Sequence, residues 1–491
     1  MERMFIDGAW RESVSGRARS IINPFNGEAI CDASEGTAAD AGRAVAAARR
    51  AFDDGEWRFL PAESRARFVG RIGDLIRRDL DELARLETLD TGKTLVESRA
   101  DMEDIESVFR YFAAQAGRLA PERVDSPRPE SSSTVVREPV GVCVLIMPWN
   151  YPLLQASWKV APALLAGNAI ILKPSELTPL TTIRLTRLME EVGLPAGIGQ
   201  LVLGSGNEVG AELAGHRDVD MVSFTGGVAT GRKIMQAASR NIKRIALELG
   251  GKNPNIVFAD ADFDAAVDQA LNAAFIHSGQ VCSAGARLLV EDPLHDRLVA
   301  ELVDRVARIK LGNGMRADTQ CGPLISEDHR LKVERYVRIG LEEGAHLAAG
   351  GRRPDEPELQ NGWFYRPTVF TNCTSTMRIV QEEVFGPVLT VERFRSERDA
   401  IRRANDTVYG LAGAVWSQDA AKADRVASEL RMGTVWINDY HPYFAQAPWG
   451  GYKQSGIGRE LAGAGLDEYT ELKHIYRNLN PQPLEWFSRA Q

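Results

Sequence analysis

The sequence predicts an α/β protein of two domains, each built around a parallel sheet. From Val140 onward, short continuous apolar runs alternate with segments whose apolar residues recur at helical spacing. Continuous apolar runs are typical of strands buried on both faces, and their alternation with helices is typical of parallel sheets. A second pattern of this kind begins after Gly250–Gly251, and a chain of 491 residues is too long for one ordinary core.

The chain up to about residue 120 is predicted to be rich in helix, because "AADAGRAVAAARRAFDD" and "RARFVGRIGDLIRRDLDELARLETL" carry apolar residues at helical spacing. The strands predicted for the first sheet are "VGVCVLIMPW", "NAIILKPS", "GQLVLG", "DMVSFTG" and "KRIALELG". Ligands of such sheets bind where strands end and helices begin. We therefore expect functional residues in the turns that follow these strands.

The second pattern runs from "NPNIVFADADFDAAVDQALNAAF" through "HRLKVERYVRIGLEEGA" to about residue 450. Two strand-like segments, "SSSTVVREPV" and the tail from "YTELKHIYRN", have no evident place in either sheet. Their residues alone leave two interpretations open, a surface hairpin and an arm between subunits.

Composition and charge exclude several classes of function. The formal net charge is −8 and no basic block occurs, so we expect no nucleic-acid partner. The N-terminus has no apolar signal core, and no apolar stretch reaches the roughly 20 residues of a membrane helix, so we expect a cytoplasmic protein without membrane contact. The five cysteines are far apart without CxxC spacing, and the seven histidines form no HExxH pattern, which argues against disulfides and a catalytic metal.

One cysteine, Cys282 in "GQVCSA", is a candidate nucleophile. Gly279 and Gly285 flank it, which indicates a tight turn or a close approach to a ligand. A free thiol has a pKa of about 8.5 and needs help to attack at neutral pH. On the local residues alone, a buried inert cysteine is the commoner alternative.

Two polar residues near predicted strand ends could assist such a thiol. Glu248 follows an apolar strand and precedes a Gly-Gly pair, so it is a candidate general base, the alternative being a solvated strand end. Asn150 stands between Pro148 and Pro152, which hold the backbone rigidly. A fixed amide donor suits an oxyanion hole, the alternative being a simple turn.

Three further segments suit a dinucleotide. "LKPSELTP" ends a strand with Lys173 and Glu176, which could bracket a ribose and disfavour a 2′-phosphate, or could form a solvated charged loop. "FTGG" opens a helix whose free N–H groups favour a phosphate. "QEEVFGPV" joins Glu383 to Phe385, a pair suited to a second ribose and a flat ring. "GSGNEVG" is a weak dinucleotide signal.

Together these segments resemble the aldehyde dehydrogenase superfamily over essentially the whole chain. The matching motifs, in the family's order, are "PWNYP", "LKPSE", "FTGG", "LELGGKNP", "GQVCSA", "EEVFGPV" and "GYKQSGIGRE". The segment "TVWINDYHPYFAQAPWGGYKQSGIGREL" is most similar to the betaine aldehyde dehydrogenase branch.

The resemblance implies a chemical role for each motif. Cys282 would attack the aldehyde, with the oxyanion held by Asn150 and the Cys282 N–H, and Glu248 would activate water to hydrolyse the resulting thioester. Lys159 and Glu460 match positions of a proton relay. The implied cofactor is NAD, although some members with the equivalent of Glu176 also accept NADP. The implied cofactor contacts are Ile146, Pro148, Trp149, Lys173, Ser175, Glu176, Gly206, Gly210, Phe224, Gly226, Gly227, Leu249, Glu383 and Phe385.

The substrate predicted from this resemblance is betaine aldehyde, oxidised to glycine betaine. Tyr151, Trp158 and Trp449 would line the channel, and ring faces attract a quaternary ammonium. Ile276 stands where many betaine aldehyde enzymes have another aromatic residue, so ω-aminoaldehydes such as 4-aminobutyraldehyde or 4-trimethylaminobutyraldehyde, and broad specificity, are alternatives. The residues that would complete the pocket instead are Tyr440, His441 and Phe444.

The family arrangement implies two parallel-sheet Rossmann-like α/β domains and a small β oligomerisation arm. The NAD-binding domain would span 1–120 and 141–250, the catalytic domain 251–450, and the arm 121–140 and 466–491, giving a homo-oligomer, either a dimer or a dimer of dimers. It also implies K⁺ as a structural ion near Asp90. A CoA-acylating enzyme typically lacks the base that Glu248 provides, and a non-enzymatic scaffold would not need Cys282 or Glu248.

Overall fold

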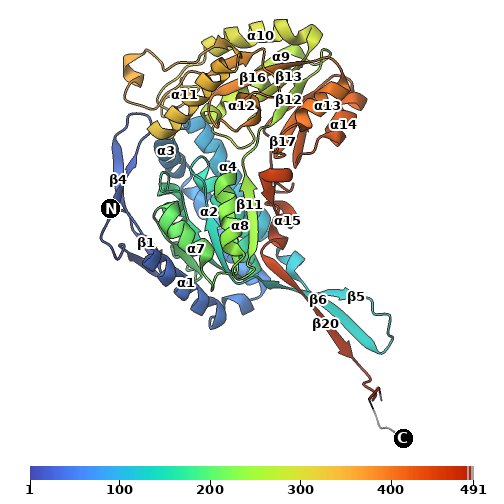
Figure 1. The fold of residues 1–491 in the computed structure, drawn as a ribbon. Coiled ribbons are helices and arrows are strands. Elements are labelled where there is room, and N and C mark those ends of the chain that lie inside the picture. Colours follow the sequence, from blue (N-terminus) through green and yellow to red (C-terminus); the bar gives the residue numbers. More distant parts are fainter. Residues whose placement is uncertain (484–485, 488–491) are drawn as a thin grey trace.

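The structure, a computed structural model, describes residues 1–483, 486 and 487 and consists of two sheet-bearing lobes and a projecting arm (Figure 1). Among these residues, no helix is both long and apolar enough to cross a membrane. The predicted α/β fold class is confirmed, because both large sheets consist mainly of parallel strands.

The first lobe is built on an eight-stranded sheet in the order β19-β11-β10-β7-β8-β9-β1-β2. The bounds are β1 (Met4–Ile6), β2 (Ala9–Arg11), β7 (Val142–Ile146), β8 (Ala169–Lys173), β9 (Gly199–Leu201), β10 (Met221–Gly226), β11 (Arg244–Leu249) and β19 (Gly456–Ile457). The five strands from β7 to β11 are parallel and include each of the predicted apolar runs. The chain runs from β7 to β9 in one direction and then returns to the other side of β7, so the strand order reverses between β7 and β10. Such a switch point leaves a crevice at the carboxyl ends of the strands.

Eight helices belong to this part of the chain: α1 (Ala38–Asp53), α2 (Ala62–Arg78), α3 (Leu80–Thr91), α4 (Leu95–Ala113), α5 (Pro152–Ala166), α6 (Leu180–Glu191), α7 (Ala211–Gly215) and α8 (Val228–Ala238). Reciprocal capping by Thr37 with Asp40 and by Thr94 with Glu97 fixes the starts of α1 and α4. Helix α5 is buried along its whole length and is bounded by Pro152 and the left-handed Gly167. A helix buried all round positions its side chains rigidly.

The second lobe holds a seven-stranded sheet in the order β14-β15-β16-β13-β12-β17-β18, parallel except for β14. The strands are β12 (Pro254–Val257), β13 (Arg287–Glu291), β14 (His346–Ala349), β15 (Thr368–Thr371), β16 (Val388–Phe394), β17 (Ala412–Trp416) and β18 (Thr434–Ile437). The helices are α9 (Phe263–Phe275), α10 (Asp292–Ala307), α11 (Glu327–Glu342), α12 (Arg378–Gln381), α13 (Glu397–Asn405) and α14 (Ala420–Glu429). The chain crosses between the two sheets at Gly250–Gly251, where β11 ends and β12 follows.

The arm is a three-stranded antiparallel sheet that leaves the body near α15 (Ala462–Asp467) (Figure 1). It consists of β5 (Glu122–Val124), β6 (Ser131–Pro139) and β20 (Thr470–Asn478). Strand β20 pairs with β6 from Thr470 opposite Pro139 to Asn478 opposite Ser131. The two strand-like segments without a place in either sheet therefore pair with each other. Residues 484–485 and 488–491 of the predicted arm lie outside the described residues.

The prediction for the N-terminal region was incomplete, because four strands precede the first helix. β1 and β2 extend the first sheet in antiparallel fashion next to β9, and β3 (Ala18–Ile22) pairs with β4 (Ala29–Ser34). The strands β1 and β2 have three residues each, too few for a periodic pattern to emerge. Strand β19, near the C-terminus, also joins the first sheet, beside β11.

Candidate active site

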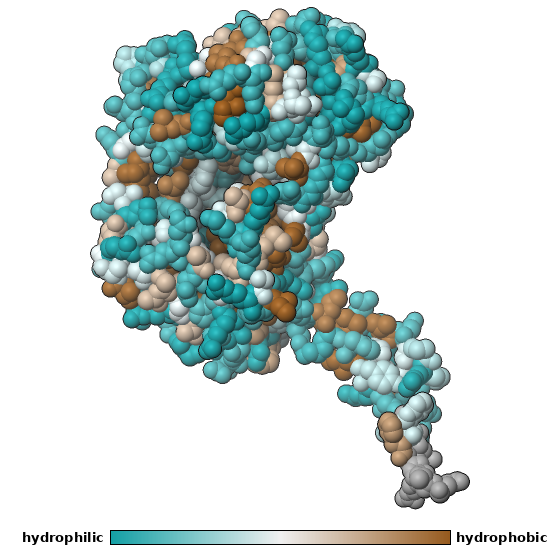
Figure 2. All heavy atoms as spheres, in the orientation of Figure 1, coloured by the Kyte–Doolittle hydropathy of each residue, from teal (hydrophilic) through white to brown (hydrophobic). Residues whose placement is uncertain are grey.

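A cavity of about 700 Å³ lies between the two lobes, where the space-filling view shows a furrow (Figure 2). All the residues predicted to contact a cofactor line this cavity, from Ile146 on β7 to Phe385 in the second lobe. Asn150, Glu248 and Cys282 line it as well. The structure thus brings residues that are far apart in the sequence to one crevice.

Strand ends build the floor of the cavity. Ile146, Lys173, Gly226 and Leu249 are the last residues of β7, β8, β10 and β11, whose carboxyl ends meet at one edge of the sheet. This is the switch point of the strand order. The sequence-based expectation that chemistry follows these strands therefore agrees with the geometry.

The start of α8 offers free backbone N–H groups to the cavity. Gly227 is its N-terminal cap and supplies no side-chain hydrogen bond. A Cβ added to Gly227 would meet no atom within 4 Å, whereas one added to Gly226 would lie 2.4 Å from the Phe224 ring. The open space before a helix N-terminus suits a phosphate group.

Lys173 and Glu176 form an ion pair at one end of the cavity, with 3.3 Å between Nζ and Oε2. The Gly206 N–H donates to the other Glu176 oxygen at 3.4 Å. Burial lowers the pKa of Lys173, an effect that Glu176 opposes. Burial alone would raise the pKa of Glu176, but the Lys173 ammonium and the backbone N–H groups of Glu176 and Gly206 together outweigh it, and the pKa is lowered. The ionised carboxylate can accept hydrogen bonds from a ribose.

Glu383 approaches the cavity from the second lobe. The Gly251 N–H donates to its Oε1 at 3.1 Å, and a Cβ on Gly250 would lie 2.2 Å from its Oε2. Burial raises the pKa of Glu383 to about 7, against the opposing charge of Lys332. Glycine at 250 is therefore required for the close approach of this carboxylate.

Phe385 and Trp149 meet edge to face at 5.2 Å between ring centroids. Phe385 has a positive φ of 60°, and its carbonyl accepts a hydrogen bond of 2.6 Å from His329. A bulky residue rarely adopts this backbone conformation, so the hydrogen bond helps to hold the ring in the cavity wall.

Cys282 lies half-buried in a loop after α9. The side-chain amide of Asn253 donates to the Cys282 carbonyl at 2.8 Å and to the Ala284 carbonyl at 3.0 Å. The preceding His277, Ser278 and Gly279 all have positive φ. Burial raises the pKa of the Cys282 thiol to about 12, and the carboxyls of Glu383 and Glu248 add to this. The backbone N–H groups of Cys282 and Ser283 oppose the shift.

The Asn150 side chain points toward the cysteine loop. It is 5% exposed, and its Nδ2 donates to the Gln280 carbonyl at 2.9 Å. An amide nitrogen carries a second hydrogen, which this bond leaves available. Together with the Cys282 N–H, it can stabilise an oxyanion on a carbon attached to the thiol.

Glu248, Glu460 and Lys159 form a buried group behind the cavity. Lys159 on α5 is ion-paired with Glu460 and is completely buried. Burial raises the pKa of Glu248, Glu460 raises it further, and Lys159 opposes both effects. Lys159 and Glu460 do not line the cavity, but their charges act on a carboxyl that does.

Aromatic side chains surround the other end of the cavity. Trp158, Trp449 and Tyr443 contact one another. The ring centroids lie 5.4 Å apart for Trp158 and Tyr443, 5.9 Å apart for Trp158 and Trp449, and 6.3 Å apart for Tyr443 and Trp449. Of the predicted substrate residues, Trp449 and Tyr151 line the cavity and Trp158 packs behind them. One face of the Tyr151 ring is occupied by the Lys93 ammonium, 3.9 Å from the centroid. Only its other face can meet a ligand.

The remaining predicted substrate residues stand outside the cavity lining. The Tyr440 hydroxyl donates to the Ser283 carbonyl at 2.9 Å, and His441 Nδ1 lies 3.5 Å from the Ser283 hydroxyl, so both support the cysteine loop. Ile276 is half-buried at the end of α9, and Phe444 is 59% exposed.

Several residues of the site were not predicted. Tyr443 lies among residues that the sequence analysis named, and its hydroxyl donates to Asp104 Oδ2 at 2.8 Å. The Thr225 hydroxyl donates to Gln155 at 3.1 Å, and both line the cavity with His329 and Lys332. Thr225 lies within the quoted "FTGG", but no motif marked Gln155, His329 or Lys332. Aromatic spacing within "DYHPYF" could have indicated Tyr443.

Asp90, the candidate cation ligand, is completely buried at the end of α3. Its Oδ2 accepts a hydrogen bond of 2.9 Å from the Leu180 N–H, and burial raises its pKa well above the ordinary value. Within residues 1–483, 486 and 487, no three acidic, histidine or cysteine side chains gather as a metal site.

Comparisons with known proteins agree with one another. The model of the aldehyde dehydrogenase family matches residues 10–475. The chain is 66% identical to betaine aldehyde dehydrogenase of Bacillus subtilis (strain 168), over 99% of both chains. It is 44% identical to aminoaldehyde dehydrogenase 2 of Zea mays, over 99% of this chain and 97% of that protein. A solved structure of a betaine aldehyde dehydrogenase point mutant from Staphylococcus aureus, in complex with NAD⁺ and with a BME-modified cysteine, superposes with a TM-score of 0.98 at 60% identity, over 99% of each chain.

Proposed function

Because the chain belongs to the aldehyde dehydrogenase family, we propose that it oxidises betaine aldehyde to glycine betaine with NAD as the oxidant. The observation that carries this proposal is the single cavity that joins a dinucleotide-binding edge of the first sheet to Cys282, Asn150 and Glu248. Two relatives with that substrate in their names, at 66% and 60% identity, support the choice of aldehyde.

The cavity residues fit NAD. The open N-terminus of α8 suits the pyrophosphate, and the Lys173–Glu176 pair suits the adenosine ribose. Glu383 would hold the second ribose, and Phe385 with Trp149 would flank the nicotinamide. Bound NAD⁺ supplies the acceptor for the hydride that leaves the aldehyde carbon.

The protein's own residues carry the acyl transfer. Glu248 takes the thiol proton of Cys282 and passes it on before hydrolysis. The sulfur attacks the aldehyde carbon, and the oxyanion accepts hydrogen bonds from Asn150 Nδ2 and the Cys282 N–H. After oxidation, the acyl group is held on Cys282 as a thioester. Glu248 takes a proton from the water that hydrolyses the thioester and releases the acid and the thiol. Glu460 and Lys159 are the buried groups through which this proton would leave.

The aromatic wall suits a trimethylammonium group. Trp449 and Tyr151 line the cavity and present π-electron density. Tyr443 packs against Trp449 outside the lining, and the Asp104 carboxylate lies behind its hydroxyl. No hydrogen-bond acceptor is needed to hold such a cation, since it has no N–H to donate. An ω-aminoaldehyde is the second candidate, supported by the aminoaldehyde dehydrogenase at 44% identity.

The test is NADH formation with betaine aldehyde, 4-aminobutyraldehyde, 4-trimethylaminobutyraldehyde and hexanal. We expect the highest kcat/KM with betaine aldehyde and no turnover by Cys282→Ala. A preference for hexanal would leave the family assignment intact and refute the cation pocket. Full activity of Cys282→Ala would refute the nucleophile.

We also propose that residues 1–120 and 141–250 act as the NAD-binding domain, 251–450 as the catalytic domain, and the arm as a site of homo-oligomerisation. Strand β20 carries exposed Leu472, Ile475 and Tyr476, and Figure 2 shows apolar surface on the arm. Such a surface suits burial against a second copy. Light scattering of Ile475→Asp should show a smaller particle than the wild type; an unchanged mass would refute this role.

A further inference from the structure

A narrow cleft adjoins the end of the cavity at which Lys173 and Glu176 lie. It is lined by Arg19 and Glu35 on one side and by Ser175 and Glu176 on the other. Ser175 and Glu176 also line the main cavity, so the two spaces share a wall. Arg19 and Glu35 come from the N-terminal strands that the sequence analysis did not detect.

Two glycines bring Glu35 to this position. A Cβ added to Gly36 would lie 2.2 Å from the Leu203 carbonyl oxygen. A Cβ added to Gly204, which has a φ of 128°, would lie 2.9 Å from the Gly36 carbonyl oxygen. Only glycines allow the chain after β4 to touch the chain after β9, and this contact places Glu35 at the carboxyl edge of the first sheet.

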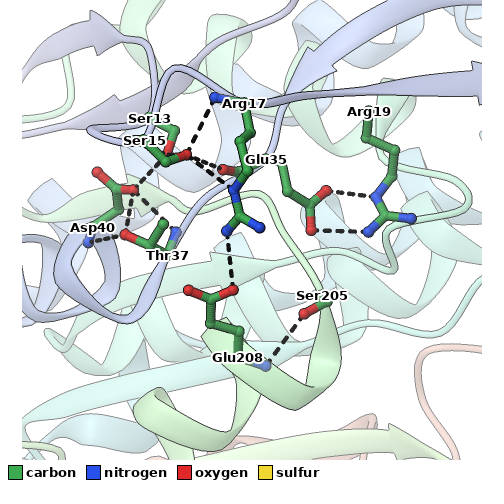
Figure 3. A network of polar contacts seen from close by, with 9 residues as sticks. All are labelled: Ser13, Ser15, Arg17, Arg19, Glu35, Thr37, Asp40, Ser205 and Glu208. Carbon is green, nitrogen blue, oxygen red and sulfur yellow. Dashed lines mark hydrogen bonds and ion pairs between the residues drawn. The ribbon is translucent and has the colours of Figure 1, made fainter.

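Glu35 holds the Arg19 guanidinium with both carboxylate oxygens. Arg19 Nε donates to Oε2 at 2.5 Å and Nη2 donates to Oε1 at 2.9 Å. The Glu35 side chain is 11% exposed and that of Arg19 is 39% exposed. Figure 3 shows the two groups edge to edge, with the Nε–Nη2 edge of the arginine bonded to both carboxylate oxygens.

Two side-chain hydrogen bonds anchor the segment that precedes Arg19, one to the start of α1 and one to the turn after β9. The Ser13 hydroxyl donates to Asp40 at 2.8 Å at the start of α1, and Arg17 donates to Glu208 at 3.1 Å (Figure 3). Glu208 belongs to the turn whose Gly206 N–H donates to Glu176. The N-terminal strand is therefore tied to the same turn as the predicted ribose ligand.

Four charged groups thus share this corner: Arg19, Glu35, Lys173 and Glu176. Their charges shift one another's pKa values. The Glu35 hydrogen bonds raise the pKa of Arg19, and the charge of Glu176 adds to this. The pKa of Lys173 responds in turn to Glu35 and Arg19, besides burial and Glu176. A dianionic phosphate entering the corner would meet two carboxylates, and the charge of the guanidinium that could bind it is already balanced by Glu35 through its Nε–Nη2 edge.

We propose that Glu35 and Arg19 form a second cofactor-selecting pair behind Glu176: Glu35 balances the charge of Arg19, uses its Nε–Nη2 edge, orients the guanidinium toward itself, and so disfavours NADP. This inference rests on the proposed NAD site. It concerns the ratio of the two cofactor affinities, whereas the proposed site concerns whether NAD binds at all.

The test measures the dissociation constants of NAD⁺ and NADP⁺ by calorimetry, without aldehyde, in the full-length protein. In Glu35→Gln the freed Arg19 should tighten NADP⁺ binding relative to NAD⁺ about ten-fold. Arg19→Met should weaken NADP⁺ relative to NAD⁺, because Glu35 is then unpaired. The double variant with Glu35→Gln and Arg19→Met should lose the tighter NADP⁺ binding expected of Glu35→Gln. Arg50→Met, whose exposed ion pair with Asp7 lies outside the lining of both spaces, is the matched control and should leave the ratio unchanged.

Three results would overturn the inference: an unchanged ratio in Glu35→Gln that still binds NAD⁺ normally, a gain that persists in the double variant, or equal weakening of both cofactors, as a purely structural ion pair would give. If Glu35→Gln does not fold, Arg19→Met alone decides, since an unchanged ratio there contradicts the proposal. Failure of the wild type to bind NAD⁺ would instead refute the proposed function.

Discussion

The Asn150 side-chain amide donates a 2.9 Å hydrogen bond to the Gln280 carbonyl, in the loop that carries Cys282. This bond joins the end of β7 to the second lobe and fixes the amide beside the thiol. It allows a donor from one lobe to serve Cys282, the proposed nucleophile, in the other lobe.

Replacement of Asn150 by alanine should lower kcat about 10²–10³-fold, because one donor to the oxyanion is lost. Stopped-flow NADH measurements should show a slower first turnover. Binding of NAD⁺ should be nearly unchanged, since the Asn150 amide hydrogen-bonds the cysteine loop. A normal first turnover in a folded Asn150→Ala protein would exclude this role.

Gly250→Ala should weaken cofactor binding, because its Cβ would collide with the Glu383 carboxylate. Gly42→Ala is the control: its Cβ would meet no atom within 4 Å, and Gly42 lies in α1, outside the cavity lining. We expect an increase of the NAD⁺ dissociation constant of about ten-fold for Gly250→Ala and less than about two-fold for Gly42→Ala. Equal effects would contradict the placement of Glu383 in the site.

Binding of NAD⁺ should depend on pH through Glu383, whose pKa of about 7 is raised by burial. Below that pH the carboxyl is neutral; above it, the carboxylate is the stronger acceptor for ribose hydroxyls. Affinity should therefore rise as the pH increases through about 7 and then level off. Calorimetry at several pH values checks this, and Glu383→Gln should give a flatter profile.

The same group affects stability. The folded-state pKa lies above the ordinary value of 4.5, so folding is favoured less as the pH rises from 4.5 to about 7, where Glu383 ionises in a buried position. Glu383→Gln should thus be more stable relative to the wild type at high pH than at low pH. Thermal melts across this range would show a constant difference if the carboxyl were not buried.

Trp449→Leu should reduce kcat/KM for betaine aldehyde relative to hexanal about 2- to 30-fold, since a π face is lost while apolar contact is kept. Phe444→Leu is the matched control, because Phe444 is 59% exposed and outside the cavity lining. Equal losses for both aldehydes in Trp449→Leu would mean that the ring serves only as apolar wall.

Much of the first sheet could be predicted because its strands are buried on both faces and read as continuous apolar runs. The site residues on β7, β8, β10 and β11 follow those runs directly, as Lys173 and Leu249 illustrate. Strands β1 and β2 could not be predicted, since three-residue edge strands carry no period. Their pairing depends on contacts with β9, far away in the sequence.

The partners of the site residues could not be predicted either, because they come from segments far away in the sequence. Nothing near Tyr151 in the sequence indicates that Lys93 covers one face of its ring, and nothing near Glu176 indicates Arg19 and Glu35. Local motifs identify the groups that carry chemistry. The groups that orient them are supplied by distant elements, and only the folded chain shows which.

The most direct test of the account is a single-turnover experiment with Glu248→Gln, NAD⁺ and betaine aldehyde. Burial raises the pKa of Glu248, so the neutral, isosteric glutamine should be tolerated in the fold. The account predicts one equivalent of NADH per active site, slow turnover thereafter, and a trimethylammonioacetyl group on Cys282 by mass spectrometry. Steady turnover at the wild-type rate, or NADH release with an unmodified Cys282, would contradict the thioester mechanism.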